Sequence, residues 1–346
     1  MKIHRPIIGI SLGDPFSIGP EITVKVLNNP YIYSICKPIV YGDLFCIKEA
    51  LKITNINLII NPIKQVSEAK CEYGTIDLMN FDLIKSIGKS KDSIIGGEAS
   101  FQYVNRVIED ALANRIDATV TNAISKKAIN MAGHNYAGHT EIYADLTKTK
   151  KYTMMLACRN LRVVHVSTHV SLRKACDLVK KERVLEVIEI ANKGLIQLGI
   201  SNPRIAVAAL NPHAGENGLF GDEEINEINP AISQAIKEGI NIPDKKAMPA
   251  DSIFSKAIGG LYDVVVCMYH DEGHIPSKVA GFKYDNEKNI FKAVEGVNIT
   301  LGLPIIRVSV DHGTAFDIAY KNKANSLSLE NAIIEATKMA NNKSVK

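Results

Sequence analysis

Residues 264–278 read VVVCMYHDEGHIPSK, an apolar and β-branched run that gives way abruptly to histidine, acidic residues, glycine and lysine. Such a run is typical of a buried strand, and the polar residues after it indicate a loop at the carboxyl end of that strand. Loops at this end of the strands are where open parallel sheets bind their ligands. We therefore expect His270 and its neighbours to lie at a functional site.

Two other strand-like runs also end close to a histidine. Residues 163–167 are followed by His169, and residues 204–208 are followed by His213. The carboxyl ends of parallel strands lie on one edge of a sheet, so these imidazoles and His270 could meet around a single cation. Three neutral imidazoles with an open fourth position are typical of a catalytic divalent site. The alternative for each histidine by itself is a hydrogen-bonded loop residue.

Two further histidines lie near this predicted site. His165 falls inside a predicted strand, and we interpret it as a core residue. His274 follows His270 by four positions. Because Gly273 and Pro276 disfavour a helix here, we expect His274 in a loop and not in a helical pair of metal ligands.

Asp251 and Asp271 flank the predicted metal ligands in the sequence. Each could be a further ligand, a residue that orients an imidazole, or a general base. The sequence leaves these roles open.

Cationic, amide and hydroxyl groups that suit a phosphate or carboxylate are also available, namely Lys278, Asn298, Arg307, His139 and Thr140. The alternatives are a solvated surface pair for Lys278 and a structural ion pair for Arg307. The patterns G-x-G-x-x-G and G-x-x-x-x-G-K-[ST] do not occur in the sequence, so neither standard nucleotide motif is indicated.

Composition narrows the class of protein. The chain has 346 residues, of which 46% are hydrophobic, which is enough for two domains or one large α/β unit. Its 41 Lys and Arg nearly balance 37 Asp and Glu, and we expect no nucleic-acid partner. Six scattered cysteines suit a reducing cytoplasm. No apolar run approaches the roughly 18 residues of a membrane helix, so we expect a soluble cytoplasmic protein without a membrane partner.

Strand-like and helix-like segments alternate along the chain, which favours a mostly parallel sheet with helices on both faces. We expect strands at residues 7–11, 38–41, 56–60, 118–120, 154–157, 163–167, 204–208, 264–268 and 305–309. The strands at 154–157 and 163–167 are expected to pair as a hairpin. Residues 61–95 show no clear pattern, and we expect irregular structure there.

Several motifs, taken in order, resemble the 4-hydroxythreonine-4-phosphate dehydrogenase family, PdxA. They are Gly-Asp-Pro at 13–15, Ile-Gly-Pro-Glu at 18–21, Gly-His-Thr-Glu at 138–141, Ser-Thr-His at 167–169, Leu-Asn-Pro-His-Ala-Gly-Glu at 210–216, Pro-Ala-Asp at 249–251, Met-Tyr-His-Asp at 268–271, Gly-Val-Asn-Ile-Thr-Leu-Gly-Leu-Pro at 296–304 and Ser-Val-Asp-His-Gly-Thr-Ala at 309–315. Each motif alone is weak, but their number and order are specific and cover nearly the whole chain.

The resemblance implies an α/β fold like that of isocitrate and isopropylmalate dehydrogenases, with two α/β/α domains, a mostly parallel sheet and an interdomain cleft. It also implies a homodimer whose active sites lie at the subunit interface. We accordingly expect a first domain at residues 1–125 plus 305–346. The second, at 126–304, would carry the metal ligands and the dimer contacts.

The implied reaction is the NAD-dependent, metal-dependent oxidation of 4-phosphohydroxy-L-threonine, followed by decarboxylation to 3-amino-2-oxopropyl phosphate. This reaction belongs to pyridoxine 5′-phosphate (vitamin B6) biosynthesis. NADP is the alternative cofactor. Zinc is the metal we expect, with magnesium or cobalt as alternatives.

The family pattern also assigns residues. It implies the metal ligands His169, His213 and His270, in agreement with the strand-end argument. It implies substrate contacts from His139, Thr140, Lys278, Asn298 and Arg307, with Asp251 close by. It places the NAD adenine end at His312, Gly313, Thr314 and Ala315. The group that takes the hydroxyl proton stays open among Asp251, Asp271, Lys278 and a metal-bound water.

The chain departs from the family pattern at residues 283–295, a charged insertion that we expect to form a surface loop or lid. Phe16 and Ser17 also replace the small pair expected there. The main alternative function is a related dehydrogenase for threonate or erythronate 4-phosphate. A phosphoacyltransferase and a non-catalytic metabolite-binding protein are the alternatives from other classes.

Overall fold

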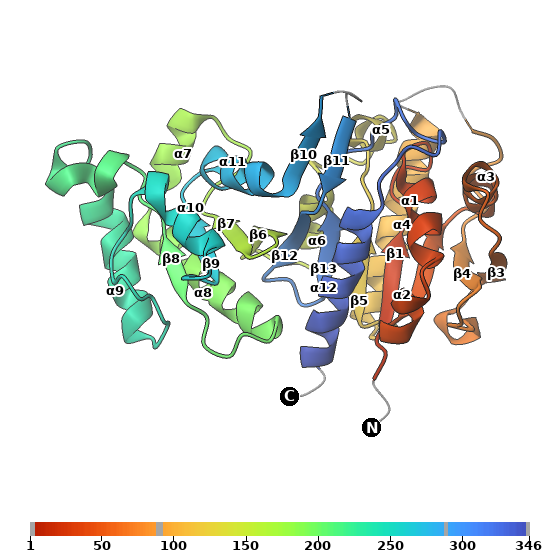
Figure 1. Cartoon of the computed structure of the whole chain (residues 1–346), viewed down its shortest axis with the longest axis horizontal. Coiled ribbons are helices and arrows are strands. Elements are labelled where there is room, and N and C mark those ends of the chain that lie inside the picture. Colours follow the sequence, from red (N-terminus) through yellow and green to blue (C-terminus); the bar gives the residue numbers. More distant parts are fainter. Residues whose placement is uncertain (1–3, 88–92, 287–289, 344–346) are drawn as a thin grey trace. The chain divides into compact units, whose positions relative to one another are not determined.

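The computed structural model describes residues 4–87, 93–286 and 290–343. The chain divides into two compact units, which Figure 1 shows coloured along the sequence. Unit 1 comprises Met1–Lys150 and Leu303–Lys346, and unit 2 comprises Lys151–Gly302. Residues 126–150, which we expected in the second domain, therefore belong to unit 1. Both units alternate strands and helices, which confirms the predicted α/β class.

Unit 1 is built on a parallel sheet. Its described strands, in spatial order, are β3 (Ile59–Ile63), β4 (Thr75–Asn80), β2 (Lys37–Gly42), β1 (Ile7–Ser11), β5 (Ala118–Thr121) and β13 (Arg307–Val310). The inner strands are apolar and buried, as in Ile8 and Ile10 of β1, because helices cover both faces.

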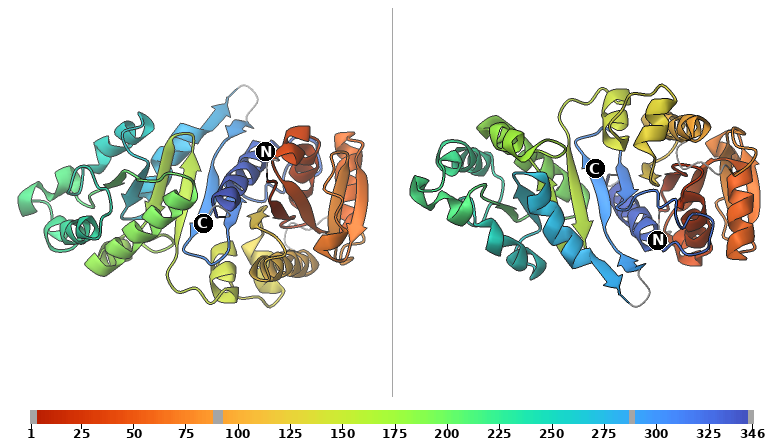
Figure 2. Two further views of the ribbon diagram at one scale, coloured as in Figure 1. Left: turned by 90° about the horizontal axis from the view of Figure 1, so that it is seen from below. Right: turned by 90° about the horizontal axis from the view of Figure 1, so that it is seen from above.

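The helices of unit 1 form two groups, one on each face of its sheet (Figure 2). One face carries α1 (Gly19–Leu27), α2 (Pro30–Ile35) and α12 (Leu327–Lys343), with α3 (Leu44–Thr54) beside α1; the other carries α4 (Ile94–Leu112), α5 (Lys126–Met131) and α6 (His139–Leu146). Ser125 caps α5 as a hydrogen-bond acceptor for the Ala128 amide at 3.1 Å. Gly97 allows α4 to approach α5 closely, since a Cβ there would lie 2.0 Å from the Ala128 carbonyl oxygen.

Unit 2 has a mixed sheet. Its described strands, in spatial order, are β12 (Val297–Leu301), β6 (Thr153–Cys158), β7 (Leu161–His165), β9 (Val264–Cys267) and β8 (Ile205–Val207). β6 and β7 form the predicted antiparallel hairpin, whereas β7, β9 and β8 run parallel. The carboxyl ends of these three parallel strands therefore lie on one edge, which confirms the arrangement expected before the three histidines.

The helical segments of unit 2 lie on both faces of this sheet (Figures 1 and 2). They are α7 (Leu172–Leu178), α8 (Lys181–Gln197), the short helical segments η2 (Pro212–Gly218) and η3 (Glu224–Ile228), α9 (Asn229–Lys237), α10 (Ala250–Ile258) and α11 (His270–Gly281). Helix α8 packs on one face, and α10 and α11 pack on the other. In the part of the chain that the structure describes, every helix is too short or too polar to cross a membrane.

Two sequence predictions between residues 56 and 95 are wrong in detail. The strand expected at 56–60 lies at β3, three residues later, and β4 was missed within the region expected to be irregular. The reason for the missed strand is Asp77, a buried acid in the middle of β4 that interrupts its apolar pattern. Its carboxylate accepts the amides of Lys70 at 3.0 Å and Cys71 at 2.8 Å, so its burial is compensated.

The insertion at 283–295, expected as a surface loop or lid, consists mostly of a β-hairpin. β10 (Phe282–Asp285) pairs antiparallel with β11 (Ile290–Val294), while residues 287–289 lie outside the described part of the chain. Arg159 donates from Nη2 to Glu295 Oε1 at 2.9 Å beside the end of the hairpin.

Candidate active site

The junction between β9 and α11 corrects the loop predicted at residues 270–278. The strand ends at Cys267 and α11 already begins at His270. Glu272, the third residue of the helix, accepts the Met268 amide and so closes the turn. Gly273 makes the helix compatible with the core, since a Cβ there would lie 2.5 Å from His165 Nε2.

Helix α11 also changes the interpretation of His274, because the expected loop position is wrong. The rings of His270 and His274 are stacked on one helix face, with centroids 3.6 Å apart and planes 11° apart. His165 is buried as expected, and its ring centroid lies 4.8 Å from that of His274. Burial lowers the pKa of His165 to about 3 and that of His274 to about 4, so both rings are uncharged near neutral pH.

His169 and His270 line one pocket of about 260 Å³, together with Asp271 and Tyr269. Their ring centroids lie 5.7 Å apart. Two imidazoles that bind one tetrahedral zinc ion have centroids about 5 Å apart, so this spacing fits a shared cation closely. His270 Nδ1 lies 2.6 Å from Asp271 Oδ1, so Nε2 is the ring nitrogen that could bind a cation.

His213 occupies an unusual backbone conformation. Residues from His213 (φ 54°) to Asn217 (φ 57°) all adopt left-handed values, which cost non-glycine residues about 1 kcal/mol each. The buried Glu224 carboxylate stabilises the start of this turn. It accepts the Asn211 amide at 2.8 Å and Asn211 Nδ2 at 2.9 Å. His213 therefore lies in a strained backbone segment. Strained segments of this kind are common at functional sites.

The predicted ligand set is only partly assembled. Among residues 4–87, 93–286 and 290–343, no group of three or more His, Cys, Asp or Glu side chains is placed to hold a metal. The structure brings His169 and His270 together but does not bring His213 to them. Asp251 lies exposed in the first turn of α10, which packs against the η2 segment that carries His213.

Lys278 and Asn298 are the predicted substrate contacts in unit 2. Lys278 lies two helical turns beyond His270 on the same side of α11, and its Nζ lies 4.3 Å from the centroid of the Phe282 ring. Asn298 lies on β12, is partly buried and is paired with Leu156 of β6. A cation therefore lies on the same helix face as the histidines.

Arg307 and His139 form a second group, within unit 1. Arg307 begins β13 and is buried. Its Nη2 donates to Thr121 Oγ1 at 3.0 Å, and its Cζ lies 5.5 Å from the Tyr143 ring centroid. Burial lowers the pKa of Arg307 to about 10, so the guanidinium stays charged at neutral pH.

His139 opens α6 as predicted, followed by Thr140. Burial, and then the charge of Arg307, hold the pKa of His139 well below its usual value of 6.5. Its Nε2 is buried, and within the described residues it has no hydrogen-bond partner. A neutral imidazole, a hydroxyl and a guanidinium are thus available to hydrogen-bond an anionic ligand.

The loop after β13 carries the predicted cofactor residues. The Thr314 carbonyl accepts the Ile18 amide at 3.1 Å, which ties the loop to the start of α1. Ala315 has a left-handed φ of 45°. A Cβ at Gly313 would meet no atom within 4 Å, so the backbone is open to a ligand at this point.

Sequence reasoning missed the acidic side chains that hold these elements in place. Glu272 closes the turn before α11, and Glu224 holds the turn that carries His213. Burial raises the pKa of Glu272 to about 8, so it is largely protonated at neutral pH. The four-residue spacing of His270 and His274 was a usable signal for their shared helix face, whereas no local pattern identifies Glu224.

We expect the free energy of unfolding to fall less at acid pH in His139→Gln than in the wild type. The unfolded chain takes up a proton below pH 6.5 that folded His139 resists, so this residue makes the folded state less stable as pH falls. In urea titrations, the free energy of unfolding should fall by about 1 kcal/mol more in the wild type than in His139→Gln between about pH 7 and pH 5.5. Thr140→Val, in the same turn, is the control that keeps the wild-type profile. Parallel profiles for the wild type and His139→Gln would contradict the burial argument.

Comparison with protein families identifies a match over most of the chain. The family model described as pyridoxal phosphate biosynthetic protein PdxA matches residues 34–336. A Clostridium botulinum (strain Hall) protein provisionally named a D-threonate 4-phosphate dehydrogenase is 45% identical, over 97% of each chain. An Oceanobacillus iheyensis protein of the same name is 44% identical, over 97% of this chain and 98% of that one.

Solved structures extend this similarity to the fold. A 4-hydroxythreonine-4-phosphate dehydrogenase from Burkholderia phymatum has a TM-score of 0.82 and 40% identity, with 97% of this chain and 98% of that chain covered. The enzyme of that name from Klebsiella pneumoniae has a TM-score of 0.82 and 38% identity, with 97% and 99% covered. The chain belongs to the PdxA family.

Proposed function

We propose that this protein is an NAD-dependent dehydrogenase that oxidises 4-phosphohydroxy-L-threonine and releases carbon dioxide to give 3-amino-2-oxopropyl phosphate. This step would serve pyridoxine 5′-phosphate biosynthesis. The observation that carries the proposal is the pocket in unit 2 where His169 and His270 come together at a spacing that suits one metal ion. Membership of the PdxA family and similarity to dehydrogenases of that specificity support the substrate.

The metal site in this proposal consists of His169, His213 and His270. A divalent cation, zinc in preference to magnesium or cobalt because the ligands are imidazoles, would supply charge stabilisation for the substrate alkoxide and then for the enolate. Asp271 holds Nδ1 of His270 and so directs Nε2 outward. We assign Asp271 this orienting role because its carboxylate is already engaged by the ligand imidazole.

Two groups of side chains would hold the substrate anions. In unit 1 the group is His139, Thr140 and Arg307, and in unit 2 it is Lys278 and Asn298. Arg307 is suited to a carboxylate or phosphate because its guanidinium is charged and buried. His139 is suited because its buried Nε2 can pair with a ligand.

Three side chains are candidates for accepting the hydroxyl proton, namely Asp251, Asp271 and Lys278. Asp251 is exposed, and Asp271 contacts His270. Lys278 lies on the histidine side of α11, but an amine accepts a proton only in its neutral form, whereas the ammonium form would hold a substrate anion, so the choice of base stays open among these side chains and a metal-bound water. The proton would pass to that base while hydride passes to NAD. The β-keto acid formed would then lose carbon dioxide.

NAD, with NADP as the alternative, would bind at the loop His312, Gly313, Thr314 and Ala315. The open space at Gly313 supports this assignment because a ligand could approach the backbone there. The loop is also fixed by the Thr314 contact to Ile18, so it would be preorganised for the cofactor.

We also propose a homodimer with its active sites at the subunit interface. Ile275 and Val279 of α11 are large apolar side chains that are 61% and 78% exposed. They lie one helical turn apart and belong to the helix that carries His270. An apolar surface so close to the histidine pocket supports an interface there. Completion of the site by the partner subunit would also explain why the three histidines do not gather within one chain.

D-threonate 4-phosphate is the second candidate substrate. The specific observation in its favour is the provisional name of the Clostridium botulinum relative at 45% identity. The two substrates share the phosphate, the carboxylate and the hydroxyl to be oxidised. They differ at one position, where 4-phosphohydroxy-L-threonine has an amino group and D-threonate 4-phosphate has a hydroxyl. The same metal, cofactor and anion contacts therefore serve either one.

A substrate panel should decide between the two. We expect the zinc-loaded protein to form NADH with 4-phosphohydroxy-L-threonine and to release one carbon dioxide for each NADH. NADH is followed by absorbance, and carbon dioxide by a coupled assay. Turnover of D-threonate 4-phosphate alone would replace the substrate and leave the reaction class unchanged. Absence of NADH with both compounds and with erythronate 4-phosphate would contradict the proposed function.

Replacement of a single predicted ligand should release the metal. We expect His213→Ala to bind zinc at least about 100-fold more weakly, because loss of a ligand exceeds the 10- to 100-fold effect of losing its supporting hydrogen bond. Zinc per chain is measured by mass spectrometry after dialysis, together with a calorimetric titration. His134→Ala in unit 1 is the matched control and should keep its zinc. Full occupancy in His213→Ala would remove this residue from the ligand set.

A further inference from the structure

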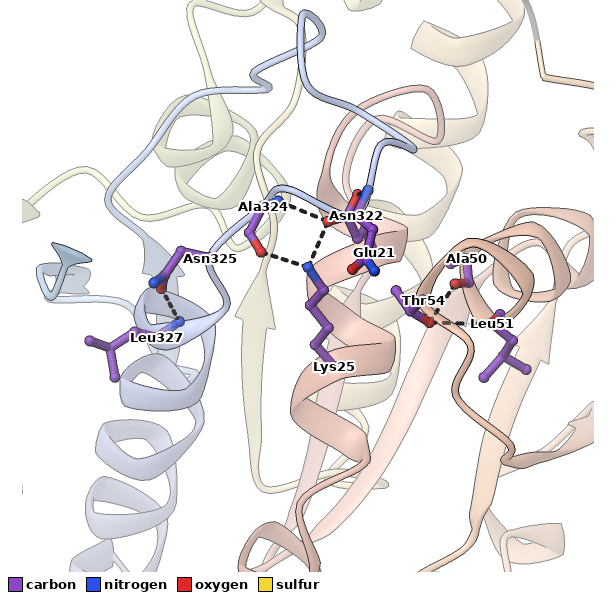
Figure 3. A network of polar contacts seen from close by, with 9 residues as sticks. All are labelled: Glu21, Lys25, Ala50, Leu51, Thr54, Asn322, Ala324, Asn325 and Leu327. Atoms are coloured by element: carbon purple, nitrogen blue, oxygen red, sulfur yellow. Dashed lines mark hydrogen bonds and ion pairs between the residues drawn. The ribbon is translucent and has the colours of Figure 1, made fainter. Parts of the chain in front are cut away.

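Glu21 is a wholly buried carboxylate in the first turn of α1. A buried charge is costly unless it is paired and hydrogen-bonded, so its partners indicate its role. Oε1 accepts Lys25 Nζ at 2.8 Å and the Ala324 amide at 2.8 Å, and Oε2 accepts the Asn322 amide at 3.2 Å (Figure 3). Most of what Glu21 binds therefore belongs to a segment about 300 positions later in the chain.

Lys25 completes a closed set of contacts. Its Nζ also donates to the Ala324 carbonyl at 2.8 Å, so Ala324 is held at both its amide and its carbonyl (Figure 3). Asn322 and Tyr320 have left-handed φ values of 57° and 56°. Such a backbone persists only where its surroundings hold it, and Glu21 is the charged group that does so here.

The segment held by Glu21 continues from the proposed cofactor loop. The Thr314 carbonyl accepts the Ile18 amide at 3.1 Å, and Tyr320 donates to the Pro15 carbonyl at 2.7 Å. Residues 314–324 are therefore fastened to residues 15–21 at several successive points. Among these contacts between residues 314–324 and residues 15–21, those of Glu21 involve a charged side chain.

We infer that Glu21 is a positioning residue that holds the loop at residues 312–324 in the conformation required for NAD binding. The inference rests on the proposed function, because it takes the cofactor site to be at His312, Gly313, Thr314 and Ala315. Glu21 itself is buried behind the loop and does not contact the cofactor in this account. Its loss should therefore weaken NAD binding and leave the chemical step nearly unchanged once NAD saturates the protein.

The test compares Glu21→Gln with Asp77→Asn. Asp77 is a matched control because it is also buried in unit 1 and accepts two main-chain amides, those of Lys70 and Cys71, but of a different loop. Glu21→Gln should raise the KM and Kd for NAD about tenfold, which corresponds to one charged hydrogen bond, with kcat within about twofold. Asp77→Asn should lower stability and leave the KM for NAD unchanged. Kd is measured by calorimetric titration with NAD.

Hydrogen exchange provides a readout that does not depend on activity. Amides of residues 312–324 should exchange faster in Glu21→Gln than in Asp77→Asn or the wild type. If Glu21→Gln does not fold, Lys25→Met keeps the carboxylate and its two main-chain contacts and removes Lys25 Nζ from both Glu21 and the Ala324 carbonyl. That variant should raise the KM for NAD in the same direction by a smaller factor.

The outcomes separate this inference from the proposed function. Wild-type protein that binds no NAD would contradict the proposed cofactor, and the exchange of residues 312–324 would still decide whether Glu21 holds the loop. An unchanged NAD affinity in Glu21→Gln, with an active wild type, would overturn the inference alone. An equal rise in the KM for NAD in Asp77→Asn would also overturn it, because the effect would then be general destabilisation.

Discussion

The hydrogen bond from the Met268 amide to the buried Glu272 carboxyl fixes the point at which β9 becomes α11. Because the helix starts immediately after the strand, His270 lies in its first turn and His274 and Lys278 follow on the same side. A helix holds side chains at fixed four-residue spacing, whereas a loop would not. The pocket lined by His169 and His270, and the position of Lys278 near it, depend on this short junction.

Much of the fold follows from apolar periodicity in the sequence. The buried strand at 264–267 and the hairpin of β6 and β7 are found where the pattern predicts them. Prediction failed where the role of a residue depends on its contacts with another segment of the chain. Gly273 was interpreted as a helix breaker, but it leaves space for His165 to pack against α11. Strand β4 was missed because Asp77 interrupts its apolar pattern, although the amides of Lys70 and Cys71 satisfy the buried carboxylate.

The sequence predicted the residue types of the candidate site better than it predicted their arrangement in space. The strand-end rule placed His169 and His270 near each other, and the structure puts both on one pocket. The same rule does not account for the left-handed turn at His213, because Glu224 stabilises it through Asn211, thirteen positions earlier in the chain. The buried carboxyl groups of Glu21, Glu224 and Glu272 each fix a backbone segment next to a proposed ligand site. Rigid support of this kind is what metal and cofactor sites require.

The central claim is that His270 and His169 bind one catalytic metal ion. The most direct measurement is anomalous diffraction at the zinc edge from crystals grown with zinc. The account predicts a peak about 2.1 Å from Nε2 of His270 and from a ring nitrogen of His169, with His213 of the same or a second subunit as the third ligand. A structure in which zinc binds elsewhere, or in which His270 remains unliganded at full zinc occupancy, would contradict the account.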